Sequence, residues 1–378
     1  MAARINTKAA MRRQLRKEMQ DMIKINNKEL KKPIFQGGMG VGVSLSKLAG
    51  AVAKAGGAGT ISAAQIGFGD PEFDSDPFQA NLRAIKREFQ KARVISPDGI
   101  IGFNIMVAMR HYEEYVRAAV QAGADFLVCG AGLPVDLPKI VKNTLMELDW
   151  SEYQPALAPV VSTEKSAHVI FRYWEKKYQC APDFVIIEGP LAGGHLGFTK
   201  EQMDIYEPDA YDEEVRRIIT ICREYASRFE KEIPVVLAGG ISTKEAADHA
   251  FSLGADAIQA ATRFVTTYEC DASDAFKEAY LNASKEDIIL VKSPVGLPGR
   301  AVKNTFSDTI MSGKRIAPAG CRGCLKNCKP DTIPYCITDA LIASVTGDAE
   351  NGLVFCGADA WRCDHLEHVE NVIKSLLP

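Results

Sequence analysis

The stretch that decides the fold is Asp183-Phe184-Val185-Ile186-Ile187-Glu188, which runs directly into Gly189-Pro190-Leu191-Ala192-Gly193-Gly194-His195. Its β-branched and aromatic residues predict a strand of a parallel sheet that is covered on both faces. The glycines that follow let the backbone approach a ligand closely, because they lack a Cβ atom. His195 stands where the strand opens into a loop, as active-site histidines often do. By itself the Gly-Gly-His triplet fits a helix end or a hairpin turn equally well, so the rest of the chain decides between these interpretations.

Similar apolar runs alternate with amphipathic helical runs from about Pro33 to about Asn282. This alternation predicts a parallel sheet with helices packed against it. Eight such units in about 250 residues match the size of a (β/α)8 TIM barrel, and a doubly wound open sheet is the alternative. The predicted strands are Pro33–Gln36, Ala58–Ile61, Ile100–Ile105, Asp125–Cys129, Leu157–Val161, Phe184–Glu188, Pro234–Ala238 and Ala257–Ala260.

Glycine and polar residues recur where the predicted strands end, which favours the barrel because barrel active sites collect at that rim. The pairs Gly239-Gly240 and Thr262-Arg263 follow the last two strands. Barrels present backbone N–H groups to a phosphate at this place, so a phosphorylated ligand or cofactor is expected. The other rim positions are Gln36–Met39, Asn104, Gly130–Gly132 and Gly193–His195.

Composition narrows the classes of function. The chain has 378 residues, is 47% hydrophobic and carries a formal net charge of -3. This net charge gives the protein no overall positive field that would attract nucleic acid, so a small-molecule substrate is expected. No apolar run approaches the ~20 residues that span a bilayer. Ten cysteines without a secretory signal favour a reducing compartment and a cytoplasmic protein. The oligomeric state stays open, a homodimer included.

The chain divides into three parts. Residues 1–31 form a basic N-terminal helical extension, which is either a solvated amphipathic helix, an upstream extension or an organelle-targeting segment. Residues 32–304 hold the barrel, and residues 305–378 form a Cys-rich C-terminal extension. We expect this last segment to fold back over the barrel mouth as a lid that keeps water out.

Five motifs, in the same order along the chain, carry a resemblance to a known family. Together they look like the nitronate monooxygenase (2-nitropropane dioxygenase) family, which also contains flavin-type enoyl-acyl carrier protein reductases and NADH:quinone reductases. The resemblance extends from about Lys32 to Asn304. The motifs are Gln36–Gly40, Ala55–Gly59, Gly102–Met106, Ala192–His195 and Ala238–Ile241.

The resemblance implies that residues 32–304 form a TIM-barrel flavoprotein with noncovalent FMN. The segment Gly37-Gly38-Met39 would line the isoalloxazine, and Asn104 would hydrogen-bond the flavin ring. Two positions depart from the family pattern, which usually has a glycine at Ala261 and an acid at Leu191. The phosphate region would be held by Gly193, Gly194, Gly239, Gly240, Thr262 and Arg263.

His195 is the predicted catalytic residue. A neutral imidazole can take the proton α to a nitro group, and the resemblance implies oxidation of alkyl nitronates with O2 through FMN. The same site could reduce an enoyl thioester or a quinone with NAD(P)H, and His195 does not discriminate between these reactions. A non-redox barrel that binds a phosphorylated ligand is the alternative outside this class, and Glu188 is its clearest catalytic candidate.

Six of the ten cysteines lie in the C-terminal segment. A C-x2-C-x3-C spacing followed by a fourth cysteine is able to ligate an iron–sulfur cluster or zinc through thiolates. The alternative is a set of reduced thiols in a compact lid. The predicted metal ligands are Cys321, Cys324, Cys328 and Cys336.

Overall fold

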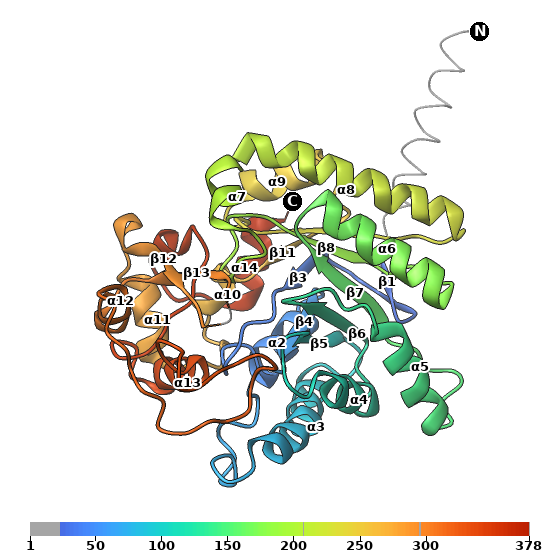
Figure 1. Ribbon diagram of the computed structural model, residues 1–378. Coiled ribbons are helices and arrows are strands. Elements are labelled where there is room, and N and C mark those ends of the chain that lie inside the picture. Colours follow the sequence, from blue (N-terminus) through green and yellow to red (C-terminus); the bar gives the residue numbers. More distant parts are fainter. Residues whose placement is uncertain (1–22, 207, 295, 378) are drawn as a thin grey trace, which may run out of the picture.

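The computed structural model describes residues 23–206, 208–294 and 296–377 (Figure 1). Most of the predicted N-terminal helical extension, together with the targeting interpretation, lies outside these residues. Its described part forms a small antiparallel hairpin of β1 (Lys24–Ile25) and β2 (Lys28–Glu29). The Ile25 side chain is buried in the same apolar cluster as the first residues of several barrel strands, so the hairpin covers the amino end of the barrel.

Eight parallel strands close into a barrel, and each of the eight predicted strands is present. The last strand pairs with the first, with Ile258 opposite Ile34. This closing pair confirms the TIM barrel and excludes the open sheet. The strands are β3 (Ile34–Gln36), β4 (Ala58–Ser62), β5 (Ile100–Met106), β6 (Phe126–Gly130), β7 (Ala156–Val161), β8 (Val185–Glu188), β10 (Val235–Ala238) and β11 (Ala257–Ala260).

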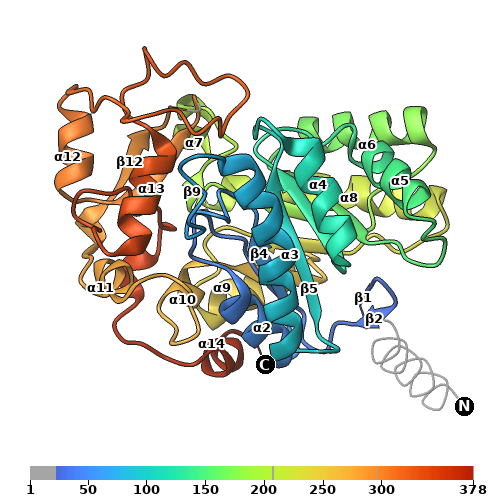
Figure 2. The ribbon, with the colours of Figure 1, turned by 90° about the horizontal axis from the view of Figure 1, so that it is seen from below.

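Helices surround the barrel on its outer side (Figures 1 and 2). Their ends follow local sequence signals: the helix that begins at Pro77 is capped by Asp76, whose carboxylate accepts a hydrogen bond from the Gln79 amide at 3.1 Å. The barrel helices are α2 (Ser46–Lys54), α3 (Pro77–Ile95), α4 (Tyr112–Ala122), α5 (Leu137–Glu147), α6 (Glu164–Tyr178), α8 (Pro208–Arg228) and α9 (Lys244–Ser252), with the short α7 (Lys200–Ile205) before α8.

Aromatic side chains fill the amino-terminal half of the barrel. The ring centroids of Phe35 and Phe126 lie 5.7 Å apart, and those of Phe35 and Phe184 lie 5.2 Å apart. All three side chains are fully buried. This packing closes the amino-terminal end of the barrel, as is usual in barrels whose site lies at the carboxyl ends of the strands.

A long excursion follows the last barrel strand. Figures 1 and 2 show its elements gathered on one side of the barrel, away from α5 and α6. Its two longer strands form an antiparallel hairpin, to which β9 (Gly194–His195) adds a third strand. The excursion comprises α10 (Thr262–Val265), α11 (Asp274–Leu281), β12 (Ile288–Lys292), β13 (Pro298–Val302), α12 (Thr305–Met311) and α13 (Ile337–Thr346).

The chain then returns to the barrel with α14 (Val369–Leu376), which contacts α2, α9 and α10. Val372, Ile373 and Leu376 are fully buried in the main core between strands and helices. Part of the predicted C-terminal segment 305–378 therefore belongs to the barrel's own helical layer. Within the described ranges, no helix combines the length and apolar character needed to cross a membrane.

Candidate functional site

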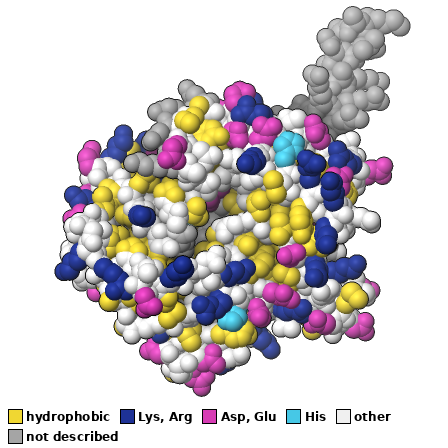
Figure 3. All heavy atoms as spheres, viewed as in Figure 1, with side chains coloured by type: hydrophobic (Ala, Val, Ile, Leu, Met, Phe, Trp, Pro, Cys, Tyr) yellow, Lys and Arg dark blue, Asp and Glu magenta, His cyan; other side chains and the backbone are white. Residues whose placement is uncertain are grey.

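A cavity of about 570 Å³ opens at the carboxyl ends of the barrel strands. Figure 3 shows the molecule hollowed near the centre of this face, with hydrophobic side chains at the border of the hollow. The predicted site residues that line the cavity are Gly37, Gly38, Met39, Asn104, Gly193, Gly194, His195, Gly239, Gly240 and Thr262.

Arg263 is the predicted site residue that the structure does not bring to the cavity wall. Its guanidinium donates to the Ser242 carbonyl oxygen at 2.9 Å and to the Glu367 carboxylate at 2.5 Å. These bonds tie the rim of the barrel to the segment before α14. In this structure the Arg263 side chain therefore joins parts of the rim and lies outside the cavity lining.

The floor of the cavity next to β3 admits no side chain at Gly38. A Cβ atom there would lie 2.3 Å from the Asn104 Cβ, well inside van der Waals contact. The neighbouring Gln36 side chain accepts a hydrogen bond from the Thr60 amide at 3.0 Å, which fixes the start of this loop. The result is a smooth backbone surface beside the Asn104 amide.

The second glycine pair shapes the wall after β10. Gly239 and Gly240 have φ angles of +93° and +79°, a conformation that side chains disfavour. Across the cavity rim, Gly357 packs so closely on Thr262 that a Cβ atom would lie 2.4 Å from its Oγ1. Among the described lining residues there is no lysine or arginine, so an anionic group here would be received by backbone N–H groups and the Thr262 hydroxyl.

The loop that carries His195 is held by the excursion. His195 lies opposite Gly299 in the pairing of β9 with β13. The buried Arg300 side chain donates to the Pro190 carbonyl oxygen at 3.0 Å and also to that of Ala192. Leu191 occupies the position where the family usually has an acid, and the Arg300 contacts hold the loop in this chain.

His195 is half-buried at the cavity wall. Its Nε2 atom lies 2.6 Å from the Ser293 Oγ, and its ring meets the edge of the Phe355 ring at a centroid distance of 5.0 Å. Desolvation lowers the pKa of His195 to about 4, because a low-dielectric environment disfavours the charged imidazolium. The imidazole is therefore neutral at physiological pH and able to accept a proton.

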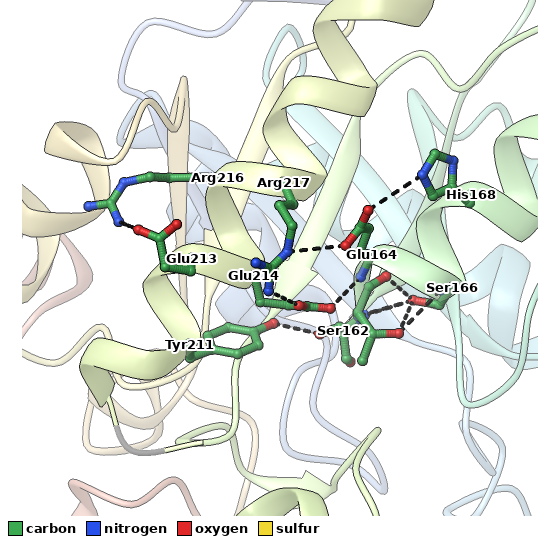
Figure 4. Close-up of polar contacts among 10 residues, drawn as sticks. Ser162, Glu164, Ser166, His168, Tyr211, Glu213, Glu214, Arg216 and Arg217 are labelled. Atoms are coloured by element: carbon green, nitrogen blue, oxygen red, sulfur yellow. Dashed lines mark hydrogen bonds and ion pairs between the residues drawn. The ribbon is translucent and has the colours of Figure 1, made fainter. Parts of the chain in front are cut away.

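Glu188, at the end of β8, also lines the cavity. Desolvation raises the pKa of its carboxyl group to about 7. Behind it, the Tyr211 hydroxyl lies 2.9 Å from the Ser162 carbonyl oxygen (Figure 4). The same hydroxyl lies 3.1 Å from the Glu188 carbonyl oxygen. Tyr211 thus holds together the carboxyl ends of β7 and β8.

The same network joins α8 to the start of α6. The Glu214 carboxylate accepts hydrogen bonds from the Glu164 amide at 2.6 Å and from Arg217 at 2.7 Å (Figure 4). Glu214 is only 6% exposed. Because both of its contacts are charge-assisted, the buried Glu214 carboxylate firmly positions the helices behind the Glu188 wall.

The excursion supplies the apolar outer side of the cavity. The predicted lid segment does reach the barrel mouth, since Phe355 and Cys356 lie in the cavity wall. The apolar residues on this side include Phe276, Leu297, Leu325, Ile337, Leu341 and Phe355.

The cysteines predicted as metal ligands do not form a metal-binding group. Among the residues that the structure describes, no three His, Cys, Asp or Glu side chains are arranged to hold an ion. Cys321 is exposed, whereas Cys324 lies at the cavity wall with its thiol hydrogen-bonded to Thr338. Burial raises the pKa of Cys324, Cys328 and Cys336. This arrangement does not support the iron–sulfur or zinc prediction.

Sequence reasoning did not find Ser293 and Arg300 among the residues that contribute to the site. Ser293 and Arg300 lie in a segment whose prolines and glycines predict only a turn. No local pattern connects that turn with His195, which is 98 residues earlier than Ser293.

A closed (β/α)8 barrel with a glycine-lined cavity and a histidine at its catalytic face defines a barrel enzyme. The family model for nitronate monooxygenase matches residues 20–378, so the chain belongs to the nitronate monooxygenase family, and the protein is a flavin-dependent oxidoreductase. The chain is 28% identical over 321 residues to the nitronate monooxygenase of Pseudomonas aeruginosa, covering 75% of this chain and 80% of that protein. The nitronate monooxygenase of Paraburkholderia phytofirmans is 26% identical, covering 73% and 75%.

Solved structures of other proteins are also similar to this chain in fold. FabK from Thermotoga maritima superimposes with a TM-score of 0.67 at 25% identity, covering 92% of each chain. Nitroalkane oxidase from Streptomyces ansochromogenes has the same TM-score of 0.67 at 19% identity, covering 92% of this chain and 95% of that one. The second match supports the fold alone.

Proposed function

We propose that this protein is an FMN-dependent monooxygenase that oxidises alkyl nitronates with O2. The observation that carries the proposal is a neutral His195 at the wall of a glycine-lined barrel cavity, in a chain of the nitronate monooxygenase family. The P. aeruginosa relative, whose name states this activity, is similar over most of both chains.

The residues around the cavity fit a planar, phosphorylated cofactor. The bare backbone at Gly38 leaves room for the flat ring, and the Asn104 amide offers it a hydrogen bond. The backbone at Gly239 and Gly240, with the Thr262 hydroxyl, would take the phosphate without a basic side chain. When bound, FMN supplies the electron transfer to O2 that no protein side chain can perform.

His195 would act on the proton. With a neutral nitroalkane, its imidazole would remove the proton from the carbon α to the nitro group and so produce the nitronate. With a preformed nitronate this step is not required, and the ring would orient the anion by hydrogen bonding. The apolar side chains of Leu341 and Phe355 would keep water from this region.

Reduction of an enoyl thioester or a quinone with NAD(P)H is the second candidate. The similarity to FabK at 25% identity favours it, because the family resemblance includes flavin-type enoyl-acyl carrier protein reductases. The neutral state of His195 suits removal of a proton from a nitroalkane, which supports the first candidate for neutral nitro substrates.

Oxygen consumption tests the proposal. Purified, FMN-loaded protein is supplied with a series of alkyl nitronates and, separately, with NADH or NADPH plus an enoyl thioester or a quinone. We expect oxygen uptake with nitronates in the absence of a nicotinamide. Turnover confined to the nicotinamide reactions would assign the reductase, and a purified protein with no affinity for FMN would point to a non-redox barrel.

A further inference from the structure

A chain of hydroxyl groups leads from His195 into the excursion. The His195 Nε2 atom lies 2.6 Å from the Ser293 Oγ. The Ser293 side chain is in turn hydrogen-bonded to the Tyr335 hydroxyl, and this hydroxyl donates to the Lys292 carbonyl oxygen at 3.3 Å. Ser293 is 2% exposed and Tyr335 is 1% exposed, so both hydroxyl groups are shielded from bulk water.

The Lys292 carbonyl at the end of this series of hydrogen bonds decides which group donates and which accepts in each bond. A carbonyl oxygen only accepts, so Tyr335 uses its single hydrogen on Lys292 and can only accept from Ser293. Ser293 then uses its own hydrogen on Tyr335, so toward the imidazole it can only accept. The His195 Nε2 atom, which faces the Ser293 Oγ, must therefore carry the hydrogen of this bond. His195 is then the Nε2–H tautomer, with its lone pair on Nδ1.

We propose that Ser293 and Tyr335 are positioning residues that fix His195 as the Nε2–H tautomer and leave Nδ1 as the atom that accepts the substrate proton. The tautomer follows from the hydrogen-bond chain alone. The role of Nδ1 as base rests on the proposed function.

The surrounding structure keeps both hydroxyl groups in place. Ser293 follows β12 in a turn closed by the hydrogen bond from the Gly296 amide to the Ser293 carbonyl oxygen at 3.0 Å. The Tyr335 ring packs edge-on against Phe306 at a centroid distance of 5.1 Å. Because both residues belong to the excursion, the excursion would set the protonation geometry of a histidine that the barrel supplies.

Nitrogen-15 NMR of histidine-labelled FMN-bound protein tests the tautomer directly, because a protonated and an unprotonated ring nitrogen give well-separated signals. The His195 signals are assigned by their loss in His195→Asn. In the wild-type protein we expect a proton on Nε2 and none on Nδ1. In Tyr335→Phe the Ser293 hydroxyl loses its tyrosine acceptor and is able to donate to Nε2, so we expect the Nδ1–H form to appear.

The catalytic activity of variants is the second measurement. We expect Ser293→Ala and Tyr335→Phe to lower kcat about 10- to 100-fold, by analogy with residues that orient metal-bound histidines, with KM changed much less. Ser293→Thr, which keeps the hydroxyl, should recover most of the rate. Tyr153→Phe is the matched control, because its hydroxyl also donates to a carbonyl, that of Ala124 at 2.5 Å, outside the cavity lining.

Two results would overturn the proposal. One is a wild-type His195 protonated on Nδ1, and the other is a Tyr335→Phe protein whose tautomer and kcat match those of Tyr153→Phe. A correct tautomer in a protein without nitronate oxidation would leave the hydrogen-bond chain intact and refute only the proposed function.

Discussion

His195 and Glu188 are two of the ionisable side chains that line the cavity, and desolvation acts on them in opposite directions. It lowers the pKa of His195 to about 4 and raises that of Glu188 to about 7. Both groups are therefore neutral between these two values, because each neutral form is the better one in a low-dielectric site. A neutral histidine is the form that can take a proton from a weak carbon acid.

Replacing His195 with alanine should lower kcat for nitroalkanes at least ~100-fold, the scale of general acid–base catalysis. Flavin content should not change, because the glycine surfaces that would hold FMN remain. Steady-state oxygen uptake and the flavin absorbance of the same sample measure both quantities. Full turnover in this variant would remove His195 from the catalytic role.

The dependence of activity on pH should show two declines, one caused by His195 at low pH and one caused by Glu188 at high pH. As the pH falls through about 4, His195 becomes charged and the rate with nitroalkanes declines. As the pH rises through about 7, Glu188 ionises and repels an anionic nitronate, so kcat/KM for preformed nitronates should decrease. Glu188→Gln should remove the decline at high pH and keep the one at low pH. A variant that retains the decline at high pH would assign it to another group.

At the scale of elements, the loop after β3 depends on a bare backbone. Gly38→Ala would place a Cβ atom 2.3 Å from the Asn104 Cβ, so one of the two must move away from the cavity floor. We expect the affinity for FMN to decrease at least tenfold, equivalent to ~1.4 kcal/mol, as measured by flavin fluorescence titration.

Gly69→Ala is the matched control for Gly38→Ala, because no heavy atom lies within 4 Å of its added Cβ. It should bind FMN as the wild-type protein does. Equal affinity in the two variants would show that the Gly38 surface is not part of the cofactor site.

The strands could be predicted from the sequence because most of them are short apolar runs with a turn signal at the end. The glycines and His195 could be placed at the cavity because barrel strands present their carboxyl ends to one face. The contacts that hold His195 in place could not be predicted from the sequence. Arg300 reaches the Ala192 carbonyl across 108 residues of sequence, and no local periodicity records such a pairing.

At the scale of the whole molecule, the barrel is completed by its last helix. Ile373 in α14 is fully buried against the main core, whereas the neighbouring Lys374 side chain is 66% exposed. Ile373→Ala should therefore reduce the free energy of unfolding by ~2–5 kcal/mol, and Lys374→Ala should change it little. Chemical denaturation measures both. A stable Ile373→Ala protein would indicate that the C-terminal segment is a dispensable appendage.

The central claim is that this barrel oxidises nitronates, and one anaerobic experiment tests it most directly. FMN-loaded protein is mixed under nitrogen with an alkyl nitronate, and in parallel with NADH and with NADPH, while the flavin absorbance is followed. We expect rapid bleaching by the nitronate alone and recovery of the absorbance when O2 is admitted. Bleaching by a nicotinamide alone, with no response to the nitronate, would contradict the account and identify a reductase.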